Sequence, residues 1–251
     1  MSPTSLSGSS HVSRGKTIQH PQNRILFALP ADEFRRLAPH LTNTTLAFKR
    51  SLSKPGQPIT HVCFPDSGVC SVMAVTHSGA AAEVGTVGNE GVTGVALFFG
   101  DTTEPTESFI QVPGAGRMLP ADIFRRELGH NVTFRQFIGH YAHALMIQIM
   151  QSAACNALHS IEQRACKWML MSHDRVFTDT FRLTHEFLAL MLGASRPTVS
   201  VVAQQLQRAG LVAYRRGEVT VLDRRGLEAG SCECYRVVRD CFDAFLQRLS
   251  D

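Results

Sequence analysis

The stretch MLGASRPTVSVVAQQLQRAGLV, residues 191–212, predicts a tight turn that leads into an amphipathic helix. Gly193 supplies the left-handed backbone that a short turn between two helices needs. Ser195 is placed to cap the second helix, and Pro197 falls in its first turn, where the helix needs no N–H donor. Gly210 is a typical helix stop. The stretch therefore predicts a helix-turn-helix, with a hairpin of an ordinary α-helical core as the alternative.

The second helix of this motif has one buried face and one exposed face. Val199, Val202, Ala203 and Leu206 repeat at the spacing of a buried face. The exposed side chains and the helix caps have the chemistry that reads DNA. Arginine pairs with guanine, glutamine with adenine, apolar groups touch the thymine methyl, and hydroxyls bind phosphate. The candidate DNA-binding residues are Thr184, Ser195, Arg196, Pro197, Thr198, Ser200, Val201, Gln204 and Arg208.

A β-hairpin is predicted directly after this helix. LVAYRRGEVTVLD, residues 211–223, contains two β-rich runs around a turn that includes Gly217. Arg215 and Arg216 lie at its tip, where they could contact a DNA backbone and add affinity that falls with salt. For either arginine alone, a solvated hairpin tip explains the sequence equally well. Beside a recognition helix, the pair favours DNA contact.

A long uncharged run precedes this region. Residues 136–161 contain no Asp, Glu, Lys or Arg, yet they include histidines and glutamines, so they are too polar for a membrane span. They predict a helix of about 25 residues buried on more than one side. A symmetric partner helix would supply its second neighbour and make a homodimer. A central helix of a monomeric domain is the alternative.

The first half of the chain predicts a β-rich domain. Short runs of Val, Ile, Phe and Thr between residues 46 and 118 alternate with turn signals such as PDSG and VGNEG, which favours an antiparallel roll or sandwich. Short helices are predicted at 29–41 and 119–128. Residues 1–23 are rich in Ser, Gly, His and Pro and predict a disordered tail.

Composition adds few constraints of its own. A net charge of +4 favours a polyanionic partner only weakly. Seven cysteines, with no secretory signal and no disulfide-like spacing, indicate free thiols in the cytoplasm.

No metal site or cofactor is predicted, because CEC at 232–234 has one residue between its cysteines. His140 and His143 could serve a metal or haem, but neutral histidines packed at an interface are the usual case. No catalytic set is visible, so an enzyme is not expected.

The order of parts resembles the Crp/Fnr family of bacterial transcription regulators. The resemblance rests on LGASRPTVSVVAQQLQRAGLV, on the hairpin RRGEVTVLDRRGLE and on the closing CECY, and in the first half on FPDSGVCSVMAV, EVGTVGNEGVTG and GAGRML. It implies an α+β chain with a cyclic-nucleotide-binding-like β-roll at 24–130, a dimerisation helix at 131–160 and a winged helix-turn-helix at 161–251. It also implies a homodimer on a two-fold-symmetric operator and contact with RNA polymerase. At Pro197 and Val201 the family usually has polar residues, so the operator should be read partly through apolar contacts and DNA shape.

The resemblance also indicates which effector the β-roll would not bind. Cyclic-nucleotide binders of this family use a Gly-Glu pair for the ribose and an Arg followed by a small hydroxyl residue for the phosphate. Here Gly94 is followed by valine, and PTES stands in place of the arginine, which offers Glu107 to a phosphate. An unknown effector other than a cyclic nucleotide is therefore expected. Glu83 and Glu90 are further candidate ligands, but exposed turn carboxylates are the favoured interpretation of both.

Together these features predict a cytoplasmic, homodimeric, sequence-specific DNA-binding regulator that has no membrane segment. The alternative is a ligand-binding or protein-binding module whose helix-turn-helix mediates protein contacts.

Overall fold

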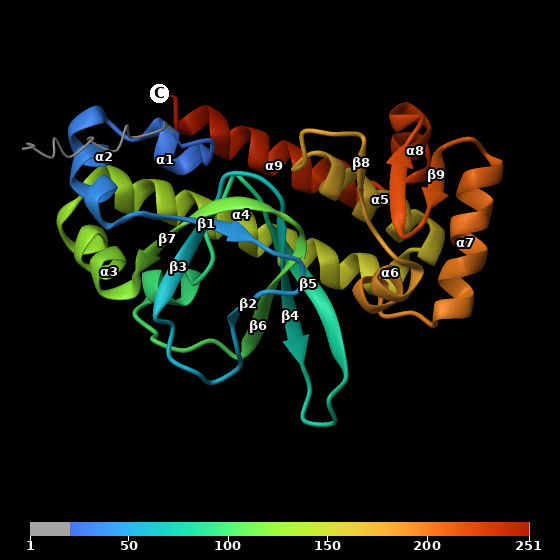
Figure 1. The fold of residues 1–251 in the computed structure, drawn as a ribbon, viewed down its shortest axis with the longest axis horizontal. Helices are drawn as coiled ribbons and strands as arrows, with labels where there is room; N and C mark the ends of the chain where they lie inside the picture. The colour runs from blue at the N-terminus through green and yellow to red at the C-terminus, as the bar shows by residue number, and fades with distance from the viewer. Residues whose placement is uncertain (1–20, 251) are drawn as a thin grey trace, which may run out of the picture.

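The computed structural model describes residues 21–250, and the chain forms a β-roll and a helical domain joined by one long helix (Figure 1). Most of the predicted disordered tail, residues 1–20, lies outside the described residues. Its last residue, Asn23, is buried and caps the first helix, α1 (Arg24–Ala28), through its side chain. The Asn23 amide also donates to the carbonyls of Pro65 and Gly91, at 2.9 and 2.8 Å.

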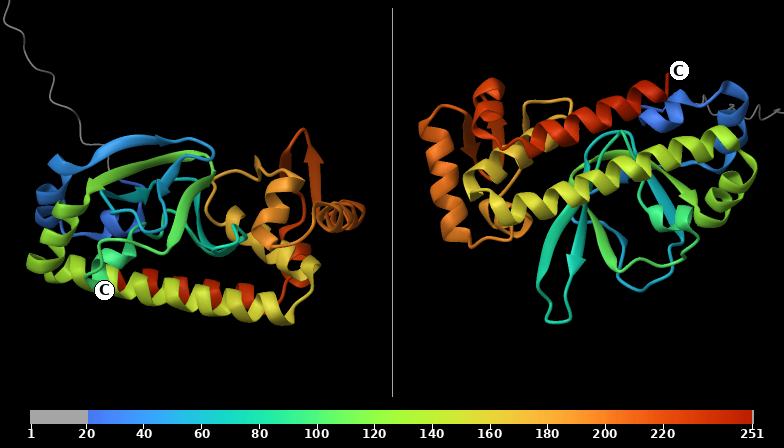
Figure 2. Two further views of the ribbon diagram at one scale, coloured as in Figure 1. Left: turned by 90° about the horizontal axis from the view of Figure 1, so that it is seen from below. Right: turned by 180° about the vertical axis from the view of Figure 1, so that it is seen from behind.

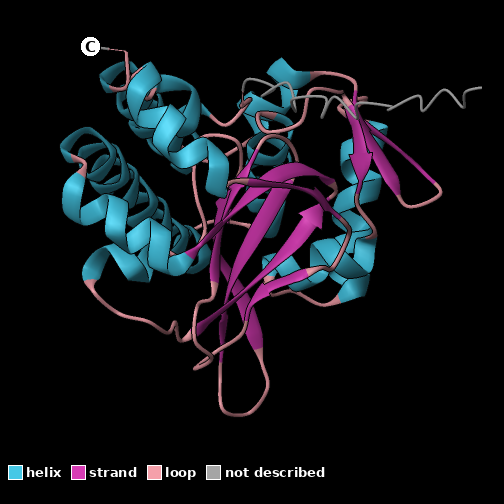
Figure 3. Ribbon diagram, turned by 60° about the vertical axis from the view of Figure 1, so that its left-hand side comes forward, coloured by secondary structure: helices cyan, strands magenta, loops and turns pink. Residues whose placement is uncertain are grey.

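The β-roll is built from two antiparallel sheets, as the turn spacing predicts (Figure 3). One has the order β1-β7-β3 and the other the order β2-β6-β4-β5. The strands are β1 (Thr42–Leu46), β2 (Ser51–Ser53), β3 (His61–Pro65), β4 (Val69–Val75), β5 (Ala81–Val87), β6 (Thr106–Val112) and β7 (Gly114–Pro120). Three short helices complete it: α2 (Ala31–Leu37), η1 (Ala38–His40) and η2 (Val95–Phe99).

Two helices lead out of the roll, and the second is the long one. They are α3 (Ala121–His130) and α4 (Val132–Leu158). Asn131 separates them because its extended backbone breaks the helix, while its side chain accepts from the Phe134 amide at 2.9 Å and starts α4. The 27 residues of α4 agree with the predicted length.

One neighbour of α4 is a helix of the same chain, which the sequence pattern did not predict. The last helix, α9 (Cys234–Arg248), runs back along α4 towards the roll (Figure 2). Tyr141 of α4 packs against the rings of Phe242 and Phe245, with centroids 6.4 and 6.0 Å apart. The roll covers another face of α4, where Gln148 and Leu145 approach β5.

The helical domain begins with α5 (Ile161–His173), which Ser160 and Gln163 start with a capping box. A three-stranded sheet of order β8-β10-β9 follows, made of β8 (Thr180–Arg182), β9 (Val212–Arg215) and β10 (Glu218–Val221). The remaining helices are α6 (His185–Leu192), α7 (Arg196–Arg208) and α8 (Arg224–Gly230). Within residues 21–250, no single helix is long and apolar enough to span a membrane; only α6 and α7 together pass by length and composition, and they are bent by 109°.

Candidate nucleic-acid interface and sensor cavity

The turn between α6 and α7 has the geometry of a helix-turn-helix. Thr184 caps α6 by accepting from the Phe187 amide at 3.1 Å, and Ser195 caps α7 by accepting from the Thr198 amide at 3.3 Å. Gly193 has φ 58°, a left-handed conformation that a side chain would strain. The two caps and the glycine are therefore the local signals that fix where both helices begin and end.

The outer face of α7 is exposed over its whole length. Val199, Val202, Ala203 and Leu206 are buried, as their spacing predicts. The exposed candidates are Arg196, Pro197, Thr198, Val201, Gln204 and Arg208. Val201 exposes 56% of its surface, so its apolar side chain is accessible to another molecule.

Ser200 differs from the other candidates on α7 because its side chain already has a partner. Its hydroxyl lies 3.1 Å from Nδ1 of His185 in α6, and the residue is half-buried. Burial and the nearby charge of Arg196 lower the pKa of His185, which favours the neutral imidazole. Ser200 therefore helps to hold α6 against α7, and Thr184 is likewise half-buried at its cap.

The hairpin of β9 and β10 forms a wing beside α7. Its two turn residues, Arg216 and Gly217, have φ 52° and 82°, as in the tight turns that suit the twist of a hairpin. Arg215 and Arg216 are exposed at its tip, as predicted. The Tyr214 amide donates to Oε1 of Gln207 at 3.1 Å, which fixes the wing to α7.

A cavity of about 320 Å³ lies between the roll and α4. Strands β4, β5 and β6, helix η2 and the α4 residues from Ala142 to Met150 contribute to its walls. The lining is mainly apolar, and among the described residues that line it none is lysine or arginine. Its one carboxylate is Glu104, whose pKa is raised because the side chain is partly removed from water. The cavity suits an apolar or uncharged ligand better than an anion.

Comparison with known proteins identifies a family for the region that contains α6, α7 and the wing. Residues 163–229 match the family model of the Crp-like helix-turn-helix domain. This region spans α6, α7 and the wing. The chain contains a Crp-like helix-turn-helix domain. No sequence among the curated proteins matches the chain.

Solved structures share the fold of the larger part of the chain. FixK2 from Bradyrhizobium japonicum has a TM-score of 0.65 at 12% identity, covering 76% of this chain and 98% of its own. A CRP-family regulator from Thermus thermophilus has a TM-score of 0.62 at 18% sequence identity, and the match covers 75% of this chain and 96% of that protein. The c-di-GMP responsive global regulator CLP from Xanthomonas campestris has a TM-score of 0.60 at 17% sequence identity, and the match covers 77% of this chain and 100% of that protein. The Thermus thermophilus protein is described as a transcriptional regulator and CLP as a global regulator, and at these identities the likeness is one of fold.

Of the four candidate effector residues, only Gly94 lines the cavity. It has φ 76°, and a Cβ there would come within 2.9 Å of Val62. Glu107 is absent from the lining although its neighbours Thr106 and Ser108 belong to it. The reason is the alternation of side chains along β6, which sends every second residue to the opposite face of the sheet.

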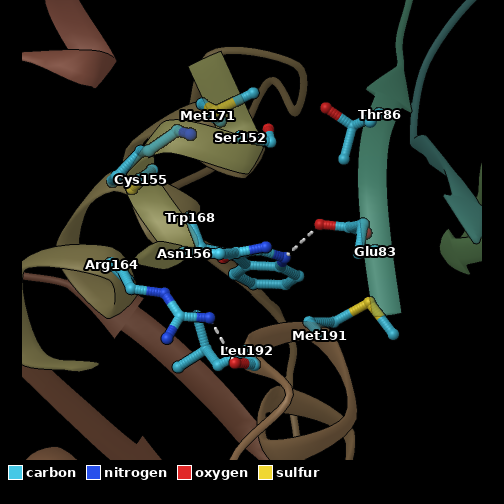
Figure 4. A pocket seen from close by; sticks show the side chains of 12 residues that line it. Glu83, Thr86, Ser152, Cys155, Asn156, Arg164, Trp168, Met171, Met191 and Leu192 are labelled. Carbon is cyan, nitrogen blue, oxygen red and sulfur yellow. Dashed lines mark hydrogen bonds between the residues drawn. The ribbon is translucent and has the colours of Figure 1, made fainter. Parts of the chain in front are cut away.

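Glu83 joins the roll to the helical domain instead of remaining an exposed turn residue. Its Oε1 accepts from Nε1 of Trp168 in α5 at 2.9 Å (Figure 4). Its other oxygen accepts from the hydroxyl of Ser71. Burial raises the pKa of Glu83 to about 7, and the hydrogen bonds from Ser71 and Trp168 oppose this shift. Nearby, the Arg164 guanidinium donates to the Leu192 carbonyl, which attaches α5 to the end of α6.

Glu90 forms a buried ion pair with Arg175, a residue that no sequence pattern singled out. The Arg175 Nε atom lies 2.8 Å from Oε1 of Glu90, and both side chains are more than nine-tenths buried. The guanidinium also donates to the Met171 carbonyl at 2.7 Å and to Oε1 of Gln148 in α4 at 3.4 Å. Glu90 is thus neither an exposed turn carboxylate nor part of the cavity lining. This pair links the roll, α4 and α5.

The two histidines considered for a metal or haem differ in their exposure on α4. His143 is exposed, whereas His140 is half-buried and lies 3.5 Å from Nη1 of Arg248 in α9. Although they are three residues apart, neither belongs to a cluster of metal-ligating side chains within the described part of the chain.

Proposed function

We propose that this protein is a sequence-specific DNA-binding regulator that acts as a homodimer on a two-fold-symmetric operator. The observation that supports this proposal most directly is the exposed outer face of α7. Arg196 and Arg208 lie at its two ends, and the wing arginines lie beside it. A helix of this length fits the major groove, and a basic hairpin beside it reaches the phosphate backbone. Contact with RNA polymerase remains a prediction from the family.

The homodimer rests on a third face of α4, which is mostly exposed in the single chain, although Gly139 lies close to Phe98 of the roll and Met146 and Met150 border the cavity. Positions spaced alternately by three and four residues define it: Gln136, Gly139, His143, Met146, Met150, Ala153 and Ala157. Met146 and Met150 expose 50% and 52% of their surface. We call these seven residues the α4 stripe. A stripe of this spacing is the pattern by which two helices pack in a coiled coil, and a two-fold axis through it matches an operator with two-fold symmetry.

The effector of this regulator is not a cyclic nucleotide. The cavity between the roll and α4 has no lysine or arginine in its described lining, and Glu104 would repel a phosphate. Binding of cyclic AMP or cyclic GMP at 1 mM, roughly 100 times a typical micromolar-range Kd, would stabilise the fold by about 2.7 kcal/mol. We expect no such change in thermal unfolding with either nucleotide. A concentration-dependent rise in Tm would contradict the proposal.

Replacing Arg196 with alanine is expected to abolish preference for the operator while leaving weak, salt-dependent binding. A bidentate contact to a base contributes about 1–3 kcal/mol of discrimination, so specific affinity should fall about 5- to 150-fold. The measurement is a gel shift with genomic fragments at two salt concentrations. Arg236→Ala, which removes an exposed arginine on α9, is the matched control. Unchanged fragment preference in Arg196→Ala would disprove the role of this residue.

A further inference from the structure

Three cysteines and one histidine from distant parts of the chain meet where α4 ends and α9 begins. Cys155 lies in the last turn of α4, and His159 is the residue that ends that helix. Cys232 precedes α9, and Cys234 is its first residue. One ligand atom from each of the four side chains lies within 4.8 Å of all the others. The three cysteines are buried, and the His159 side chain exposes only 14% of its surface.

The spacing of these atoms agrees with one tetrahedral metal centre. The sulfur atoms of Cys155 and Cys232 are 3.5 Å apart, and Sγ of Cys234 lies 3.4 Å from Nδ1 of His159. Zinc bonds of about 2.3 Å to sulfur and 2.0–2.1 Å to nitrogen separate neighbouring ligand atoms by roughly 3.5–3.8 Å. Small side-chain adjustments would therefore bring all four atoms to bonding distance from one ion.

We propose that Cys155, His159, Cys232 and Cys234 bind a Zn²⁺ ion. Three thiolates and one imidazole form a donor set that zinc prefers and that calcium and magnesium do not. All four coordination positions are taken by protein atoms, which is typical of a structural site and not of a catalytic one. The one-residue spacing of Cys232 and Cys234 is compatible with this, because the other two ligands come from α4.

The groups around the four ligands support the same assignment. Glu233 Oε1 lies 3.3 Å from Nε2 of His159, so the carboxylate orients the ring with Nδ1 towards the cysteines. Carboxylates in this position commonly fix metal-bound histidines. The Gln151 amide donates to Sγ of Cys234 at 3.1 Å. Buried Lys167 lines the same small cavity as Cys155, and its charge would balance the net negative charge of Zn²⁺ with three thiolates.

The position of the site suggests what the ion does. Cys155 and Cys232 are 77 residues apart in sequence, and α5, α6, α7 and the wing lie between them. A metal ion bound to both cysteines would connect the two ends of this segment. It thereby fixes the DNA-binding helices relative to α4, because metal binding and folding of the site are coupled.

The test is the metal content of the full-length protein, purified under reducing conditions, supplied with Zn²⁺ and then passed through a chelating column. We expect about one zinc per chain, and a loss of most of it in Cys234→Ser and Cys155→Ser. Cys241→Ser, which changes a cysteine of α9 outside the cluster, is the matched control and should retain the metal. Equal zinc content in wild type and Cys234→Ser, or none in either, would overturn the proposal.

Two further measurements cover the case in which the cysteine variants do not fold. Glu233→Ala leaves all four ligands in place, and we expect it to weaken zinc affinity about 10-fold or more in competition with a chromophoric chelator. Co²⁺ added to the metal-free wild type should give the absorption of a tetrahedral thiolate site. Zinc should also protect Cys155, Cys232 and Cys234 from alkylation. Equal alkylation with and without Zn²⁺, or a Cys155–Cys232 disulfide under reducing conditions, would overturn the site.

Discussion

Replacing Glu90 with alanine is expected to lower the free energy of unfolding by about 3–5 kcal/mol. The change leaves the Arg175 guanidinium buried without its carboxylate, since the Arg175 side chain exposes only 7% of its surface. The remaining acceptors, the Met171 carbonyl and Gln148, carry no charge. The loss is measured by urea unfolding with the fluorescence of Trp168, the single tryptophan, which lies at the junction of roll and helical domain.

A second substitution at the same pair separates the unpaired charge from the lost packing. In the double variant Glu90→Ala with Arg175→Met, no charge remains buried, so we expect recovery of at least half of the lost stability. Glu186→Ala is the matched control, because this exposed glutamate lies in the first turn of α6 and its loss should change stability by less than about 0.5 kcal/mol. A loss below about 1 kcal/mol in Glu90→Ala would contradict the assigned role of the ion pair.

The helix-turn-helix could be predicted from sequence because its determinants are local. Thr184 and Ser195 cap helices within three residues of themselves, and Gly193 adopts its left-handed turn without help from distant contacts. The same holds for the wing, whose turn requires only two residues with positive φ. Each of these features stabilises its own segment before tertiary contacts form.

The polar contacts between the domains could not be predicted, because they join residues far apart in the chain. Glu90 and Arg175 are separated by 85 positions, and so are Glu83 and Trp168. A sequence pattern reports which face of a helix or strand is buried, but not what covers it. For this reason Glu90 could be read as a turn carboxylate.

The faces of α4 illustrate the same limit. The sequence of α4 shows several overlapping apolar faces but not how many other elements pack against them. The structure assigns one of these faces to α9, which packs against Tyr141. Likewise, the alternation along β6 turns Glu107 away from the cavity and leaves Thr106 and Ser108 in its wall, which depends on the register of that strand. Register comes from pairing with β4 and is not encoded in PTES itself.

Replacing Met146 with glutamate is expected to raise the dissociation constant of the proposed dimer by at least 100-fold, which corresponds to about 2.7 kcal/mol. Met146 lies in the middle of the α4 stripe and is half-exposed in the single chain. In a two-fold dimer it would face its own copy, so the substitution would bring two carboxylates together in a desolvated contact. Analytical ultracentrifugation over a range of protein concentrations measures the change.

Operator affinity should fall together with dimer affinity, because a monomer engages one half-site only. Met146 also lines the cavity, so Ala153→Glu, on the α4 stripe but outside the cavity lining, separates dimerisation from effector binding and should have the same effect. Val237→Glu is the matched control, since this exposed apolar residue of α9 lies off the stripe. A wild-type chain that remains monomeric at micromolar concentration, or dimers of Met146→Glu and Ala153→Glu as stable as those of Val237→Glu, would show that the α4 stripe is not the interface.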